Sequence, residues 1–187
     1  NANSASNGPA FYGGFTHAVI SGDMPAAVQF SEMLQDTAAS GRAGDQAKEL
    51  RLASLHFYAG AFDQASAAFR ALCDDYDIAQ HGTMISQYGA DTYAAAQMFE
   101  GVTRAICGDT HLVPALVAET DTHQDRLSIP VMQPWALIWG AVPLYYAGQP
   151  DAAITRVQRG LRIANQQAAA FWQITGGAWL NVIDTTE

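Results

Sequence analysis

The stretch GAFDQA at residues 60–65 decides the fold, because its pattern of a glycine followed within three residues by an aspartate recurs along the chain. The other turns with this pattern are Gly22-Asp23, Gly108-Asp109 and Gly148-Gln149-Pro150-Asp151. The four glycines are 38, 48 and 40 residues apart, and each lies between two apolar segments of helical length. Glycine readily ends one helix with a positive φ, and aspartate caps the next. The repeating unit is therefore predicted to be a helical hairpin.

Positions counted from each glycine predict where the two helices of a hairpin touch. Five residues after it come Ala27, Ala65, Val113 and Ala153, and seven residues before it come Phe15, Ala53, Gly101 and Ala141. Nine residues after it come Ser31, Phe69, Val117 and Val157. Small side chains let two helices approach closely, and larger apolar ones fill the space between neighbouring hairpins. These twelve positions are predicted to be contact positions.

The apolar periodicity predicts an all-α chain with no strand, because no segment alternates with a period of two. The predicted helices are 10–21, 24–39, 44–60, 63–76, 91–107, 112–124, 130–147, 151–166 and 170–183. Pro114 is expected to interrupt the sixth of these, and Pro143 to kink the seventh. The pattern lapses between Asp77 and Ala90, which we interpret as an insertion. We expect residues 1–9 to be a linker or a remnant of cloning, and residues 10–187 to be a single repeat domain.

Two motifs resemble a known class of repeat. The turn at 60–65, with Phe69 and Leu72 after it, resembles that of a tetratricopeptide repeat. The stretch 76–81 (YDIAQH) with 88–91 (YGAD) resembles an insertion in the helical-repeat region of large bacterial signalling proteins, such as class III nucleotide cyclases and ATPase-linked transcriptional activators. The resemblance implies a right-handed superhelix of about four hairpins plus a C-terminal helix. It also implies that any enzymatic or DNA-binding activity belongs to other parts of the parent protein.

Composition narrows the function classes. Nine basic side chains against eighteen acidic ones give a net charge of -9. This balance argues against direct binding of nucleic acid or of an anionic membrane surface, since both need many cations. The uncharged stretch 127–150 is long enough for a membrane span, but Pro130, Pro134 and Pro143 within it favour a buried helix. Two cysteines without a Cys-x-x-Cys pair favour reduced thiols, and hence a cytoplasmic protein.

The first helices of stacked hairpins are expected to line a concave groove that binds a ligand or partner. The residues predicted to point into it are Arg51, Ser54, Tyr58, Phe99, Trp135, Trp139 and Tyr146. The spacing of Trp135, Trp139 and Tyr146 places them on one helical face, which suits an aromatic anchor. The alternative is that these rings pack against the insertion or the last helix.

The insertion has two interpretations. In the functional interpretation, it folds over the groove and presents His81, Tyr88 and Asp91 to a ligand. In the structural interpretation, which we favour, Tyr88 and His81 tether the loop and Asp91 caps the helix that follows it.

No catalytic, cofactor or metal site is predicted. The candidate metal ligands Asp109, His111, Asp121, His123 and Asp125 lack a recognised spacing. His56 is predicted to be a core histidine, and no feature activates the thiols of Cys73 and Cys107.

We therefore predict a non-enzymatic interaction or regulatory module that binds a protein or peptide segment, either of a separate partner or of the parent protein. One alternative is a sensor of a small-molecule effector that uses the same aromatic groove. Another is a homodimer through the last helix, where Phe171, Trp172, Ile174 and Trp179 form an apolar surface.

Overall fold

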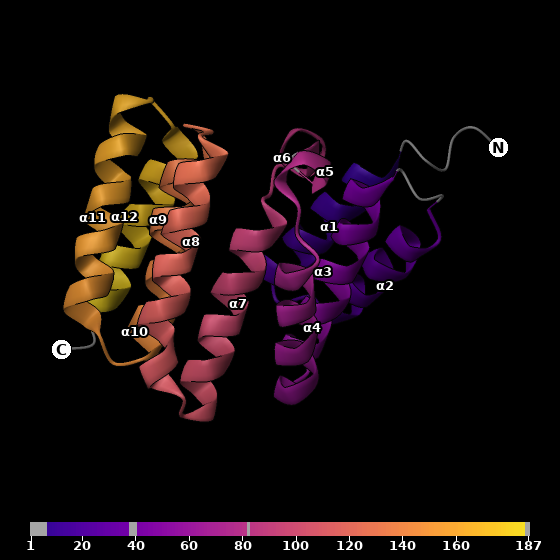
Figure 1. The fold of residues 1–187 in the computed structure, drawn as a ribbon, viewed down its shortest axis with the longest axis horizontal. Helices are drawn as coiled ribbons and strands as arrows, with labels where there is room; N and C mark the ends of the chain where they lie inside the picture. Colours follow the sequence, from indigo (N-terminus) through magenta and orange to yellow (C-terminus); the bar gives the residue numbers. More distant parts are fainter. Residues whose placement is uncertain (1–6, 38–40, 82, 186–187) are drawn as a thin grey trace. The chain divides into compact units, whose positions relative to one another are not determined.

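The computed structural model describes residues 7–37, 41–81 and 83–185, without the side chains of His81 and Thr83. All regular elements in these ranges are helices (Figure 1), which confirms the all-α prediction. The chain forms two compact units, Asn1–Ala96 and Gln97–Glu187, and each is described by itself.

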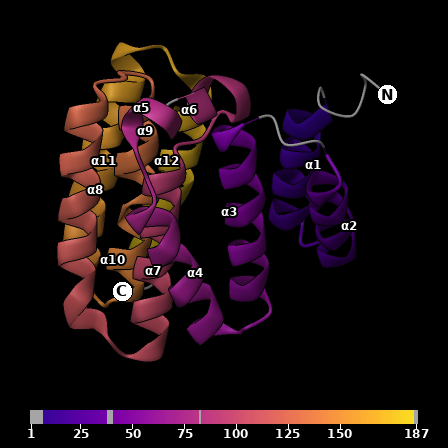
Figure 2. The same ribbon diagram turned by 45° about the vertical axis from the view of Figure 1, so that its right-hand side comes forward.

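The first unit contains two helical hairpins, which can be followed in Figure 2. Helix α1 (Gly8–Ile20) packs against α2 (Met24–Gln35), and α3 (Arg42–Tyr58) packs against α4 (Phe62–Asp74). Gly22 and Gly60 connect the helices with φ of 74° and 75°, a conformation that glycine adopts without strain. Asp23 caps α2, because its Oδ1 accepts a hydrogen bond from the backbone N–H of Ala26 at 3.0 Å.

Two short helices occupy the stretch in which no helix was predicted. They are α5 (Ile78–His81) and α6 (Thr83–Tyr88), and both pack against α3. Helix α7 (Thr92–Cys107) follows them, beginning in the first unit and ending in the second.

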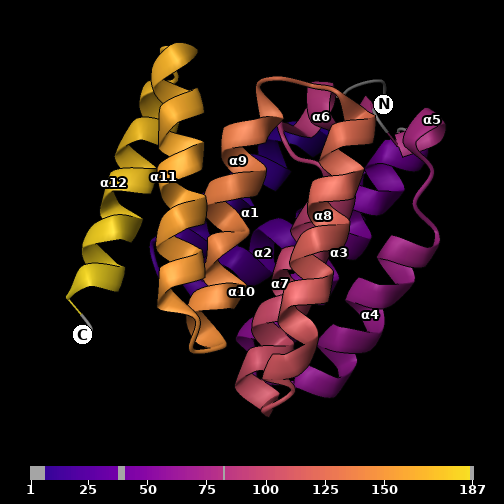
Figure 3. The same ribbon diagram turned by 60° about the vertical axis from the view of Figure 1, so that its left-hand side comes forward.

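The second unit continues with the 3-10 turn η2 (Thr110–Leu112), α8 (Val113–Leu127), α9 (Met132–Trp139) and α10 (Ala141–Tyr146). It ends with α11 (Pro150–Gln166) and α12 (Ala170–Asp184). Helix α11 packs against α9, α10 and α12, and its position beside α12 is clear in Figure 3. Gly108 and Gly148 again have positive φ, of 93° and 73°. Pro114 lies in the first turn of α8, where its missing N–H costs nothing, so the expected interruption is wrong.

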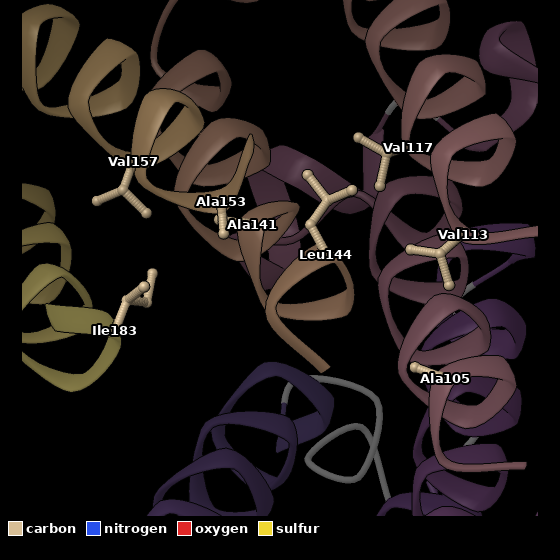
Figure 4. Packing of buried hydrophobic residues seen from close by; sticks show 8 residues of the cluster. All are labelled: Ala105, Val113, Val117, Ala141, Leu144, Ala153, Val157 and Ile183. Atoms are coloured by element: carbon tan, nitrogen blue, oxygen red, sulfur yellow. The ribbon is translucent and has the colours of Figure 1, made fainter. Parts of the chain in front are cut away.

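All twelve predicted contact positions are buried. In the second unit several of them form one core with Ala105, Leu144 and Ile183. Figure 4 shows this core: Leu144 of α10 lies toward Val113 and Val117 of α8, while Val157 of α11 lies on the side of Ile183 of α12. The packing of α1 on α2, of α3 on α4 and of α10 on α11 is consistent with the predicted hairpins around Gly22, Gly60 and Gly148. Their superhelical arrangement and their tetratricopeptide character stay predictions.

The predicted helix 130–147 is divided at Gly140 into α9 and α10. Pro143 explains the position of the break, because a proline has no N–H and its ring crowds the carbonyl four residues earlier, here that of Trp139. The uncharged stretch 127–150 is thus split into helices of 8 and 6 residues. Within the described ranges, every helix falls short of the length and hydropathy that a membrane span requires.

Candidate functional site

Three predicted groove residues of the first unit lie on one face of α3. Arg51, Ser54 and Tyr58 are three and four residues apart, a spacing that keeps side chains on the same side of a helix. Ser54 is buried and its hydroxyl donates to the carbonyl of Leu50 at 2.7 Å, whereas Tyr58 is exposed. Arg51 is only 7% exposed. This face is therefore built around a buried cation.

Helix α1 supplies the surroundings of the Arg51 guanidinium. Nη2 donates to the hydroxyl of Tyr12 at 2.5 Å, and Nη1 donates to the hydroxyl of Thr16 at 3.4 Å. The guanidinium carbon lies 3.9 Å from the centre of the Tyr12 ring and 4.7 Å from that of Phe15. Aromatic faces attract cations through their quadrupole, so the two rings stabilise the charge without an anion.

The charge of Arg51 also acts on the tyrosines near it. Burial raises the pKa of the Tyr12 hydroxyl above the usual 10, and partial desolvation raises that of the Tyr58 hydroxyl although its side chain is exposed overall; the positive charge of Arg51 opposes the rise in both. Both hydroxyls consequently stay protonated at neutral pH and remain able to donate.

The predicted groove residues of the second unit are partly covered. Trp139 of α9 makes an edge-to-face contact with Trp179 of α12, with ring centres 6.3 Å apart. Trp179 also contacts Tyr145, at 6.4 Å. This contact is the packing expected under the alternative to an open groove. Of the remaining residues, Phe99 and Trp135 are half-buried and Tyr146 is exposed.

The insertion residues pack onto the first unit. Tyr88 of α6 lies edge to face with Tyr12, at 5.3 Å between ring centres, and Met84 of the same helix is fully buried. The buried carboxylate of Asp91 accepts the backbone N–H of Tyr93 at 3.2 Å, at the start of α7. Burial, and then the Asp91 carboxylate, raise the pKa of the Tyr76 hydroxyl. The side chain of His81 lies outside the described residues.

One polar contact of the second unit was not predicted. Arg156 of α11, which is buried, donates two parallel hydrogen bonds to the carboxylate of Asp121 on α8, at 2.7 and 2.5 Å. A Cβ on Gly140 would lie 2.8 Å from Nε and Nη2 of Arg156, so glycine is what makes room for the guanidinium. The sequence carried a signal for this contact, because Arg156 shares the apolar face of α11 with Ala153 and Val157 and a charge there needs a partner.

Two surface grooves lie within the units. The first, of about 510 Å³, runs between α3 and α4 and is lined by apolar side chains together with Arg42, Glu49, His56 and Asp75. The second, of about 400 Å³, borders α10 and α11. His56, predicted as a core histidine, is half-buried at the edge of the first groove. Among the side chains that the structure describes, no three of His, Cys, Asp and Glu gather as a metal ion requires.

Comparison of the chain with protein-family models, with curated proteins and with solved structures finds no match. Function is therefore proposed from the residues and their geometry.

Proposed function

We propose that the chain is a protein-interaction module that binds a helical segment of a partner through α12. The observation that carries this proposal is an exposed apolar face on α12. Phe171 is 63% exposed, Ile174 75% and Val182 46%. Their spacings of three and eight residues place them, with the exposed Ala178, on one side of the helix. A contiguous apolar surface of this kind is typical of a docking site.

The hairpin architecture indicates what would cover this face. Helices α1 and α3 are each packed against the helix that follows, as α10 is against α11. An amphipathic helix laid on the apolar face of α12 would make the same kind of contact, which is a common mode of peptide recognition.

Charge supports a cationic partner. The stretch from Ala170 to Ile183 contains no charged residue, whereas the chain as a whole has a net charge of -9. The field of such a protein attracts a basic segment and repels an acidic one during association. The proposed occupant is therefore an amphipathic helix with an apolar face and basic ends. A regulatory role in a bacterial signalling protein is added to this proposal from the resemblance alone.

The proposal is tested by the binding of synthetic helices to the purified chain. The probe is an amphipathic helix with Leu and Phe at every third or fourth position and Lys at both ends, and a second helix has Glu in place of Lys. We expect the chain to prefer the Lys-ended helix. Ile174→Glu should weaken binding at least about tenfold, equivalent to about 1.4 kcal/mol.

Ile20→Glu is the matched control, because Ile20 of α1 is exposed to a similar extent, 72%, on another helix. It should leave the affinity unchanged. Equal affinities of the Ile174→Glu variant and the unsubstituted chain would overturn the proposal. So would a dimer in sedimentation that Ile174→Glu dissociates, because the occupant of the face would then be a second copy.

A second candidate function, sensing of a small-molecule effector, is favoured by one observation. Arg51 is a buried cation on the predicted groove face and makes no ion pair with any residue that the structure describes.

A further inference from the structure

The arginines of this chain differ in how their charge is balanced. Arg156 pairs with Asp121, and Arg104 pairs with Glu100 at 2.7 Å and with Asp109 at 3.0 Å. Arg51 is at least as buried as these, yet its partners in the described part of the chain are two hydroxyls and two aromatic rings. Arginine stays charged at every physiological pH. Acidic side chains outnumber basic ones two to one, so the missing counter-charge is not explained by a shortage of carboxylates.

The donors around Arg51 are only partly used. A guanidinium has five N–H groups in one plane, and here Nη2 and Nη1 make one hydrogen bond each while the buried Nε has no acceptor in the described part of the chain. The rings of Tyr12 and Phe15 lie within 3.9 and 4.7 Å of the guanidinium carbon and can accept none of its N–H groups as a carboxylate would, so the N–H of Nε stays available for a further hydrogen bond. The planar edge of a guanidinium matches two oxygens of a carboxylate or phosphate.

The hydroxyl of Tyr12 adds a neutral donor to this edge. It accepts a hydrogen bond from Arg51, and its own hydrogen has no acceptor among the described residues. The hydroxyl of Thr16 differs, because it donates to the carbonyl of Tyr12 at 3.0 Å. Tyr58, two turns along the same face of α3, is exposed and within the electrostatic range of Arg51.

We propose that Arg51 and the Tyr12 hydroxyl form a binding site for the oxyanion of a small effector, either a carboxylate or a phosphate. The anion would supply the counter-charge that the described protein lacks, and it would receive a bidentate contact from the guanidinium and a hydrogen bond from Tyr12. This inference rests on the second candidate function and is independent of helix binding at α12.

The test is an NMR titration of the whole chain in which the Arg Nε–H resonances are followed. Inorganic phosphate and acetate are added separately at constant ionic strength, with chloride as the reference anion. The Arg51 resonance is identified by its loss in Arg51→Lys. We expect it to shift saturably, with a dissociation constant of about 1–10 mM for a simple anion on a fixed guanidinium.

The two anions distinguish the sources of the oxyanion. Saturation by phosphate alone assigns a phosphate ligand, saturation by acetate alone assigns a carboxylate, and either result supports the proposal. Tyr12→Phe removes one hydroxyl and keeps the ring, and it should weaken the binding several-fold. The exposed Arg70 of α4 gives the matched control variant, Arg70→Lys, which should bind as the unsubstituted chain does.

The proposal is overturned if the Arg51 resonance moves no more than that of Arg70 with both anions. Arg51 would then be a structural cation held by aromatic rings. The Arg51→Lys variant serves only to assign the Arg51 resonance, and the decisive titration uses the unsubstituted chain. Its failure would leave the binding of helices to α12 untouched.

Discussion

At the scale of single residues, the fold depends on a few glycines at which a larger residue would collide with its neighbours. Gly140 is one of these. It has an ordinary helical φ of -68°, so alanine would fit its backbone. An added Cβ would nevertheless lie 2.5 Å from the carbonyl oxygen of Ala136 and 2.8 Å from the Arg156 guanidinium. Gly140 is therefore required by a contact and not by its conformation.

Gly140→Ala should lower the free energy of unfolding by about 1–3 kcal/mol, because the added Cβ collides with the backbone carbonyl oxygen of Ala136 and also displaces the Arg156 guanidinium that pairs with Asp121. Urea unfolding followed by circular dichroism measures this. Gly177→Ala in α12 is the control, since a Cβ there meets nothing within 4 Å. It should stabilise the chain by about 0.5–1 kcal/mol through helix propensity. A loss of equal size in both variants would contradict the explanation.

At the scale of helices, the short helix α6 is held to the first unit by Met84 and Tyr88. Met84 is 0% exposed and belongs to a cluster with Tyr12 and Leu34, and α6 packs against both α1 and α3. These contacts make the insertion part of the core of this unit.

Met84→Ala should cost about 2–5 kcal/mol of stability, as is typical for a fully buried side chain. It should also speed the hydrogen exchange of the α6 amides more than that of α3, since α6 loses its main anchor. Met33→Ala on α2 is the matched variant, because Met33 is 44% exposed, and it should change neither quantity much. Unchanged α6 exchange in the Met84→Ala protein would show that the anchor lies elsewhere.

The contrast between α4 and α6 shows how far sequence reasoning reached. The position of α4, predicted over 63–76 and found at Phe62–Asp74, and the twelve buried contact positions follow from a local rule, a glycine turn repeated at a nearly constant spacing. No such rule covers α5 and α6, whose four and six residues are too few for a periodicity to show. The position of Arg51 on a helix face was predicted, but its neighbours on α1 were not. Tyr12 lies 39 residues away in the sequence, so only the packing of the hairpins brings the two together.

At the scale of the whole molecule, stability depends on pH through a group of tyrosines. Tyr12, Tyr58 and Tyr76, whose pKa values are raised, all belong to the first unit. In the unfolded chain they release their protons near pH 10, whereas the folded chain retains them. The unfolded state then binds fewer protons, so stability must fall as pH rises above this value.

The free energy of unfolding should therefore decrease above about pH 10, by up to about 1.4 kcal/mol per pH unit for Tyr12 and for Tyr76, and by less for Tyr58, which is 40% exposed and screened by solvent. Tyr76→Phe should reduce this slope, and Tyr146→Phe, at an exposed position of α10, should leave it unchanged. Urea unfolding at a series of alkaline pH values measures the slope. Identical slopes in all three proteins would refute the assignment to Tyr76.

The close fit between Gly140 and Arg156 also constrains how this chain can evolve. A larger residue at position 140 collides with the guanidinium of Arg156. A shorter residue at position 156 leaves a gap beside Gly140, and the carboxylate of Asp121 then has no hydrogen-bond donor from that position. Either substitution alone therefore gives a less stable protein. We therefore expect the two positions to be replaced together in descendants of this sequence. The first mutation is tolerated only where other contacts of the protein contribute enough stability to offset its cost.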